Sequence, residues 1–224
     1  MAEAPADLRH VAVWLFDLDN TLYPVGNAFM AAIEQKMTAF VARELSLARD
    51  DAWSLQKRYL REHGTTLAGL MAHHGVDPER YLDEVHDVSL DALEPDPQLK
   101  AALGRLPGRR LVFTNGDERH AERVLEKLDL ADRFEAIFHI AAASYVPKPH
   151  PAAFARMVEA HAIEPRATCF FEDSEKNLAP AARLGMTTVL VGPHASASSA
   201  DFVRFRTEEL AAFLARARIS SGRG

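Results

Sequence analysis

The sequence lacks the features typical of membrane, disulfide-rich and nucleic-acid-binding proteins. Its one cysteine cannot form a disulfide within the chain and suits a reducing compartment. The formal net charge of −6 argues against a nucleic acid polymer as the main partner, because such proteins usually carry a basic face. The apolar stretch at residues 11–16 is too short for a signal-peptide core or a membrane span. We therefore expect a cytoplasmic, soluble protein with no membrane or nucleic acid partner.

Short apolar runs and helix-like segments alternate along most of the 224 residues. The apolar runs lie at residues 11–16, 110–114, 135–141, 167–171 and 187–192. The helix-like segments between the later runs lie at residues 118–130, 151–163 and 174–185. This alternation indicates a parallel sheet with helices on both faces. The predicted fold class is α/β with a doubly wound parallel sheet, whose site lies at the carboxyl ends of the strands.

The alternation breaks once, between the first two apolar runs. Four consecutive segments there repeat apolar residues at helical spacing, at residues 28–45, 50–64, 67–75 and 78–93. We expect an inserted all-helical cap over the carboxyl ends of the strands, with hinges at residues 21–26 and 94–98. The predicted domains are a Rossmann-like catalytic core, residues 1–24 and 97–224, and a helical cap, residues 25–96.

Two acids directly follow the first apolar run. Asp17 and Asp19 are two positions apart, so in an extended segment they point to the same side. Carboxylates are costly to bury unless they are paired, hydrogen-bonded or bound to a metal. The rest of the chain must therefore supply positive charge at this point.

Other polar clusters follow the later runs. Thr114, Asn115 and Gly116 follow one run, Glu172 and Asp173 follow another, and Lys148 lies between two prolines. If these clusters face one cavity, the carboxylates Asp17, Asp19, Asp173 and Glu172 form an oxygen-rich site suited to Mg²⁺. Thr114, the N–H groups after it and Lys148 suit a phosphate.

Four motifs in this order resemble those of the haloacid dehalogenase superfamily. They are Asp17-x-Asp19-x-Thr21, Thr114 in FTNG, Lys148 in PKP, and Glu172-Asp173 in FFEDSEKN. The resemblance covers nearly the whole chain, because the helical insertion matches the superfamily's cap between the first two motifs. It implies a Rossmann-like core and an enzyme that transfers phosphoryl groups.

The resemblance also implies roles for these residues. Asp17 would be the nucleophile that becomes an aspartyl-phosphate, and Asp19 would act as general acid and then as general base. Mg²⁺ would be held by the Asp17 carboxylate, the Asp19 backbone carbonyl and the Asp173 carboxylate, with Glu172 in support.

The phosphate-binding residues implied in the same way are Thr114, Asn115, Gly116 and Lys148. Thr114 would hydrogen-bond an oxygen of the phosphate. Lys148 would offset the repulsion between a carboxylate and a phosphate, which is about 4 kcal/mol for unit charges 4 Å apart near a protein surface.

Two features narrow the branch of the superfamily. The acid at Asp19 favours phosphoryl transfer, because the name-giving dehalogenases have a non-acid there. The segment DNTLYP and the cap segments at residues 59–70 and 81–88 resemble the pyrimidine 5′-nucleotidases. The implied substrate is a small phosphomonoester, foremost a pyrimidine nucleoside 5′-monophosphate. The alternatives are a phosphatase for phosphoglycolate or a sugar phosphate, a sugar phosphomutase, and a phosphate-binding module without activity.

Several residues in or near the cap are candidates for substrate contact. They are Tyr23, Tyr59, His63, Thr65, Thr66 and His86. Thr65 or Thr66 would begin a helix whose N–H groups face a ligand, and the tyrosines and His63 would stack on a base or bond to it. His86 also fits a hydrogen-bonded structural histidine. The sequence carries no signal for the oligomeric state.

Overall fold

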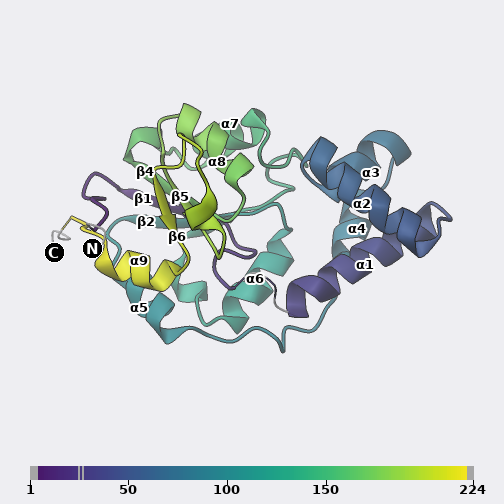
Figure 1. The fold of residues 1–224 in the computed structure, drawn as a ribbon, viewed down its shortest axis with the longest axis horizontal. Coiled ribbons are helices and arrows are strands. Elements are labelled where there is room, and N and C mark those ends of the chain that lie inside the picture. Colours follow the sequence, from purple (N-terminus) through teal and green to yellow (C-terminus); the bar gives the residue numbers. More distant parts are fainter. Residues whose placement is uncertain (1–4, 25, 27, 221–224) are drawn as a thin grey trace.

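The computed structural model describes residues 5–24, 26 and 28–220, and its centre is a parallel sheet of six strands (Figure 1). The strands are β1 (Val13–Phe16), β2 (Arg109–Phe113), β3 (Ala136–Phe138), β4 (Thr168–Glu172), β5 (Thr187–Val191) and β6 (Phe205–Thr207). Their order across the sheet is β3-β2-β1-β4-β5-β6, and every pair is parallel. The predicted doubly wound α/β fold is confirmed.

Helices cover both faces of this sheet. The helices around the sheet are α5 (Pro97–Gly104), α6 (Glu118–Lys127), α7 (Pro151–Ala160), α8 (Glu175–Arg183) and α9 (Leu210–Arg216). Side chains of β1 alternate between the two faces. Trp14 and Phe16 pack in one buried cluster with α5, α6 and α9, whereas Val13 and Leu15 pack in another with α7 and α8. The strand is apolar throughout because both of its faces are buried.

The strand order reverses at β1. From β1 the chain moves outward through β2 and β3 on one side, and β4, β5 and β6 lie on the other. A crevice opens at the carboxyl ends of the strands where the order of a parallel sheet reverses. The residues that follow β1, β2 and β4 therefore meet at one place.

Five helices of the described residues lie between β1 and β2 in sequence, and we call the first four of them the helical part. They are α1 (Ala28–Glu44), α2 (Arg49–His63), α3 (Thr66–His74) and α4 (Pro78–Val85). They lie to one side of the sheet (Figure 1) and enclose a buried cluster of their own, which includes Phe40, Leu70 and Tyr81. Val25, where the predicted cap begins, lies outside the described residues.

Four elements differ from the expectation. The helix predicted over residues 78–93 ends at Val85, because the ring of His86 turns to Asp117. Helix α5 begins where the Asp96 carboxylate accepts hydrogen bonds from the backbone N–H groups of Gln98 and Leu99. Strand β6 and helix α9 were not expected either.

The helices of the described residues include none that is both long enough and apolar enough to cross a membrane.

Candidate active site

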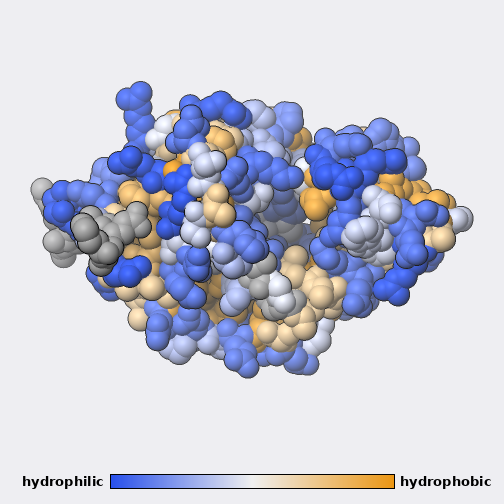
Figure 2. Space-filling model, viewed as in Figure 1, coloured by the Kyte–Doolittle hydropathy of each residue, from blue (hydrophilic) through white to orange (hydrophobic). Residues whose placement is uncertain are grey.

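A cavity of about 380 Å³ lies between the carboxyl edge of the sheet and the helical part. Figure 2 shows the surface hollowed between these two parts of the molecule. From the sheet side it is lined by Asp17, Asp19, Asn20, Thr114, Asn115, Gly116, Lys148, Glu172, Asp173, Ser174, Lys176 and Asn177. The structure thus brings all the predicted core-motif residues to one cavity, at the reversal of strand order.

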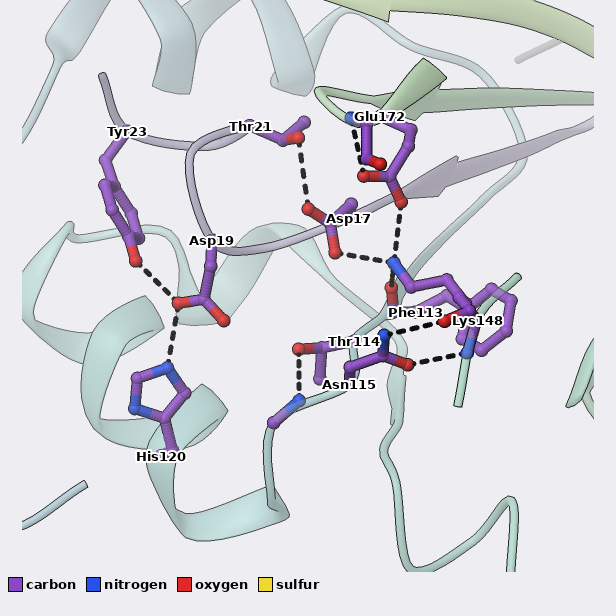
Figure 3. A network of polar contacts seen from close by, with 12 residues as sticks. Asp17, Asp19, Thr21, Tyr23, Phe113, Thr114, Asn115, His120, Lys148 and Glu172 are labelled. Atoms are coloured by element: carbon purple, nitrogen blue, oxygen red, sulfur yellow. Dashed lines mark hydrogen bonds and ion pairs between the residues drawn. The ribbon is translucent and has the colours of Figure 1, made fainter. Parts of the chain in front are cut away.

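Lys148 is the centre of the polar network in Figure 3. Its ammonium is 1% exposed and donates to the Asp17 carboxylate at 2.6 Å, the Glu172 carboxylate at 2.8 Å and the Phe113 carbonyl at 2.7 Å. Burial alone would lower the pKa of Lys148, but the two carboxylates raise it above its ordinary value. The ammonium therefore stays charged between them.

Asp17 follows β1 directly and is held at both oxygens. Lys148 donates to Oδ1, and the Thr21 hydroxyl donates to Oδ2 at 3.2 Å. Burial raises the pKa of Asp17, the charge of Glu172 raises it further, and Lys148 opposes both. The carboxylate is thus fixed in orientation, and additional positive charge nearby would stabilise its anion.

Asp17, Glu172 and Asp173 form a group of acids suited to a hard cation. Each offers an oxygen, and these oxygens all lie within 4.8 Å of one another. Burial, followed by the charges of Glu172 and Asp17, raises the pKa of Asp173. Three carboxylates share one ammonium here, so a divalent cation with oxygen ligands fits the charge and the donor set.

Both oxygens of Glu172 have partners within the protein. Oε2 accepts from Lys148, and Oε1 accepts from the backbone N–H of Ser174 at 3.0 Å. Asp173 lies next to it at the open end of β4, where it lines the cavity. Glu172 lines the cavity too, so both acids offer an oxygen to a cation bound there.

The residues that follow β2, in the FTNG segment, line the cavity and also form hydrogen bonds with the main chain of Lys148. The Asn115 side chain accepts from the backbone N–H of Lys148 at 2.8 Å and donates to its carbonyl at 3.2 Å. The Thr114 hydroxyl is buried and accepts from the backbone N–H of Gly116 at 2.9 Å, which leaves its own proton to donate. The Asn115 side chain thus positions Lys148, while Thr114 can bind an anion.

Asp19 points to partners that the sequence did not predict. Its Oδ1 receives hydrogen bonds from the Tyr23 hydroxyl at 2.5 Å and from Nε2 of His120 at 2.8 Å (Figure 3). Burial alone would raise the pKa of Asp19, but these contacts lower it to about 2. The hydroxyl of Tyr23, predicted as a substrate contact, is therefore engaged with Asp19.

The remaining candidates divide into two groups. Thr65, Thr66 and His86 line the cavity, and Thr65 caps α3 by accepting from the backbone N–H of Ala68 at 3.1 Å. Tyr59 and His63 are not among the lining residues. They pack instead with the two histidines at the end of α3, through a Tyr59–His74 hydrogen bond of 2.8 Å and a contact of 3.1 Å between His63 and His73.

His120 was missed, although its position carried a signal. It lies four residues before Val124, on the buried stripe of α6. A histidine on an apolar stripe needs a polar partner, and the sequence alone did not show that this partner is Asp19, 101 positions away.

Together these features define a class: a doubly wound α/β protein with a buried lysine and convergent carboxylates at its strand-order reversal. Residues 11–185 match the family of haloacid dehalogenase-like hydrolases, and the chain belongs to that family. It is also 29% identical over 194 residues to phosphate metabolism protein 8 of Saccharomyces cerevisiae. That match covers 80% of this chain and 60% of the yeast protein, so the chain spans about 60% of the relative's length.

Solved structures share the fold. A haloacid dehalogenase-superfamily phosphatase from Thermococcus onnurineus aligns with a TM-score of 0.61 at 19% identity, over 93% of this chain and 99% of that one. A 2-haloacid dehalogenase from Pseudomonas syringae aligns with a TM-score of 0.58 at 21% identity, over 92% and 99% of the two chains. Because one fold carries both activities, the choice between them depends on the site.

Proposed function

We propose that this protein is a Mg²⁺-dependent phosphomonoesterase that acts through an aspartyl-phosphate on Asp17. The observation that carries the proposal is the pairing of Asp17 with Lys148, beside a second acid, Asp19, that is held separately. A carboxylate fixed at both oxygens is ready to attack phosphorus, and a neighbouring acid can exchange a proton with the ester oxygen.

In the first half-reaction, an oxygen of Asp17 forms a bond to phosphorus while the bond from phosphorus to the ester oxygen breaks. Asp19 gives its proton to that oxygen, and the alcohol leaves. The contacts of Asp19 lower its pKa in the free protein, and repulsion from a bound phosphate dianion would raise this pKa and favour the protonated form. The Thr114 hydroxyl donates to an oxygen of the phosphoryl group.

In the second half-reaction, a water attacks phosphorus and Asp19 accepts its proton. The bond between phosphorus and Asp17 breaks, which frees inorganic phosphate and restores the carboxylate. Lys148 keeps Asp17 oriented throughout. Mg²⁺ held by the carboxylates of Asp17 and Asp173 and by the backbone carbonyl of Asp19 would supply the positive charge that lets a phosphate approach these acids.

The helical part lines the cavity with both apolar and polar side chains, which suits a small substrate whose leaving group has both apolar and polar parts. Its lining of the cavity includes Met30, Ile33, Met37, Leu60, Leu67 and Leu82, together with Gln56 and Lys57. A cavity of about 380 Å³ suits a small molecule and favours it over a phosphoprotein. With the nucleotidase-like segments of the sequence, this favours a pyrimidine nucleoside 5′-monophosphate, and cytoplasmic hydrolysis of such nucleotides is the proposed role.

Phosphate release from a small panel tests the proposal. The panel holds uridine, cytidine and adenosine 5′-monophosphates, phosphoglycolate and glucose phosphates, each with Mg²⁺ or with EDTA, and an Asp17→Asn variant is the control. We expect turnover that requires Mg²⁺ and Asp17 and favours the pyrimidine nucleotides.

Other outcomes of the same panel separate the alternatives. The same dependence with another preferred ester would keep the mechanism and overturn the substrate. An isomerised sugar phosphate with little free phosphate would identify a mutase. Tight nucleotide binding without turnover would identify a binding module.

A further inference from the structure

His120 lies at the acid–base end of the site although none of the four motifs contains it. It is the third residue of α6, is 2% exposed, and directs Nε2 to Oδ1 of Asp19 at 2.8 Å. The Tyr23 hydroxyl meets the same oxygen at 2.5 Å. The Tyr23 hydroxyl donates to this oxygen, and His120 donates to it in the tautomer that carries its proton on Nε2.

This arrangement leaves the second oxygen of Asp19 for chemistry. Both hydrogen bonds that Asp19 makes among the described side chains fall on Oδ1. Oδ2 points toward the side of Thr114 in Figure 3, and a Cβ atom built on Gly116 would lie 3.8 Å from it. The free oxygen thus faces the segment that is proposed to bind phosphate.

The imidazole of His120 packs against two other rings. The ring of Phe29 lies parallel to it within 2°, with centroids 5.8 Å apart, and the ring of His86 stacks on it at 4.0 Å. The Asp117 carboxylate contacts both histidines. It forms a hydrogen bond with Nδ1 of His86 and accepts one from the backbone N–H of His120 at 2.8 Å.

The two stacked rings come from the two ends of the helical part. Phe29 is the second residue of α1, and His86 directly follows α4. A shift of either end would therefore move a ring that packs against His120. Nε2 of His120 in turn contacts Asp19. In Figure 3, Tyr23 approaches Asp19 from the upper left and His120 approaches it from below.

We propose that His120 is a positioning residue that, together with Tyr23, fixes Oδ1 of Asp19 and so aims Oδ2 at the ester oxygen. Phe29 and His86 hold His120 in place. This inference rests on the proposed function, because it explains how the Asp19 carboxyl group is oriented for proton transfer in that reaction. The proton passes from Oδ2 to the ester oxygen as the bond from phosphorus to that oxygen breaks.

The test uses the dependence of the rate on the leaving group. Proton donation matters most when a poor leaving group departs, and least when a strongly acidic phenol departs. We expect His120→Leu to lower kcat/KM about 100-fold on phenyl phosphate, and by about threefold or less on 2,4-dinitrophenyl phosphate. His120→Gln, which keeps an N–H near the position of Nε2, is expected to recover most of the loss.

Tyr23→Phe provides a second and milder perturbation. It removes one donor to Asp19 and keeps the ring, so we expect a smaller loss with the same dependence on the leaving group. Tyr145→Phe is the matched control, because the Tyr145 hydroxyl contacts Glu79 at 3.5 Å and Tyr145 does not line the cavity. We expect it to change neither rate.

Equal losses on both esters would overturn the inference while leaving the proposed function in place. If His120→Leu does not fold, Tyr23→Phe decides by the same criterion. No hydrolysis of these aryl esters or of any ester in the panel by the unaltered protein, or full activity of Asp17→Asn, would overturn the proposed function and this inference with it.

Discussion

Replacing Lys148 by methionine tests whether the buried acids Asp17 and Glu172 depend on the Lys148 ammonium for the stability of the folded protein. The ammonium lies 2.6 Å from Asp17 and 2.8 Å from Glu172, which corresponds to roughly 6 kcal/mol of attraction for each pair at an effective dielectric constant of 20. Desolvation of the charges offsets much of this. The measured cost of removing one partner from a buried pair is about 3–5 kcal/mol. For a chain of this length, that predicts a fall in Tm of roughly 10 °C.

The assay is thermal unfolding followed by circular dichroism, at neutral pH in EDTA. Lys100→Met is the matched control, because Lys100 also contacts two acids, Asp129 and Asp132, but these acids are exposed. We expect its Tm to change little, since exposed ion pairs are screened by water. A second change, Glu172→Gln, should restore part of the stability lost in Lys148→Met. Equal Tm values for the two methionine variants would refute the reasoning.

Three further predictions follow from the described contacts. Asn115→Ala removes both hydrogen bonds to the Lys148 main chain, and steady-state assays should show kcat/KM lowered about tenfold. Gly69→Ala would place a Cβ atom 2.3 Å from the ring of Tyr59, so chemical denaturation should show a loss of about 1–3 kcal/mol. Mg²⁺ at 100 times its Kd should stabilise the protein by about 2.7 kcal/mol, and this stabilisation should be lost in Asp173→Asn. A Tm rise equal to that of the unaltered protein would contradict the assignment of Asp173.

Much of the fold could be predicted because the strands are buried on both faces. Runs such as residues 11–16 are apolar throughout, and the acids that follow them mark the ends of the strands. Strand β6 could not be found in this way, because it contains Arg206 and has three half-buried residues. Its place is set by tertiary contacts, including hydrogen bonds from the Arg206 guanidinium to the carbonyls of Ser198 and Ala200.

The contacts within the site could be predicted only in part. The motif acids and Lys148 converge because the carboxyl ends of neighbouring parallel strands meet at one edge. The hydrogen bond between Asn115 and Lys148 joins residues 33 positions apart, and the hydrogen bond between His120 and Asp19 joins residues 101 positions apart. Both contacts therefore exist only once the chain is folded. Helical spacing alone could not show that Tyr59 packs against Gly69 rather than facing the cavity.

Chemical trapping of the intermediate tests the central claim most directly. The protein is quenched during turnover of a hydrolysed ester with Mg²⁺ and treated with borohydride, which reduces an acyl phosphate to an alcohol. Peptide mass mapping then locates the reduced side chain. We expect substrate-dependent reduction of Asp17, with Asp19 unchanged. Turnover with no reduced carboxylate, or with reduction at another acid, would contradict the role of Asp17 as nucleophile.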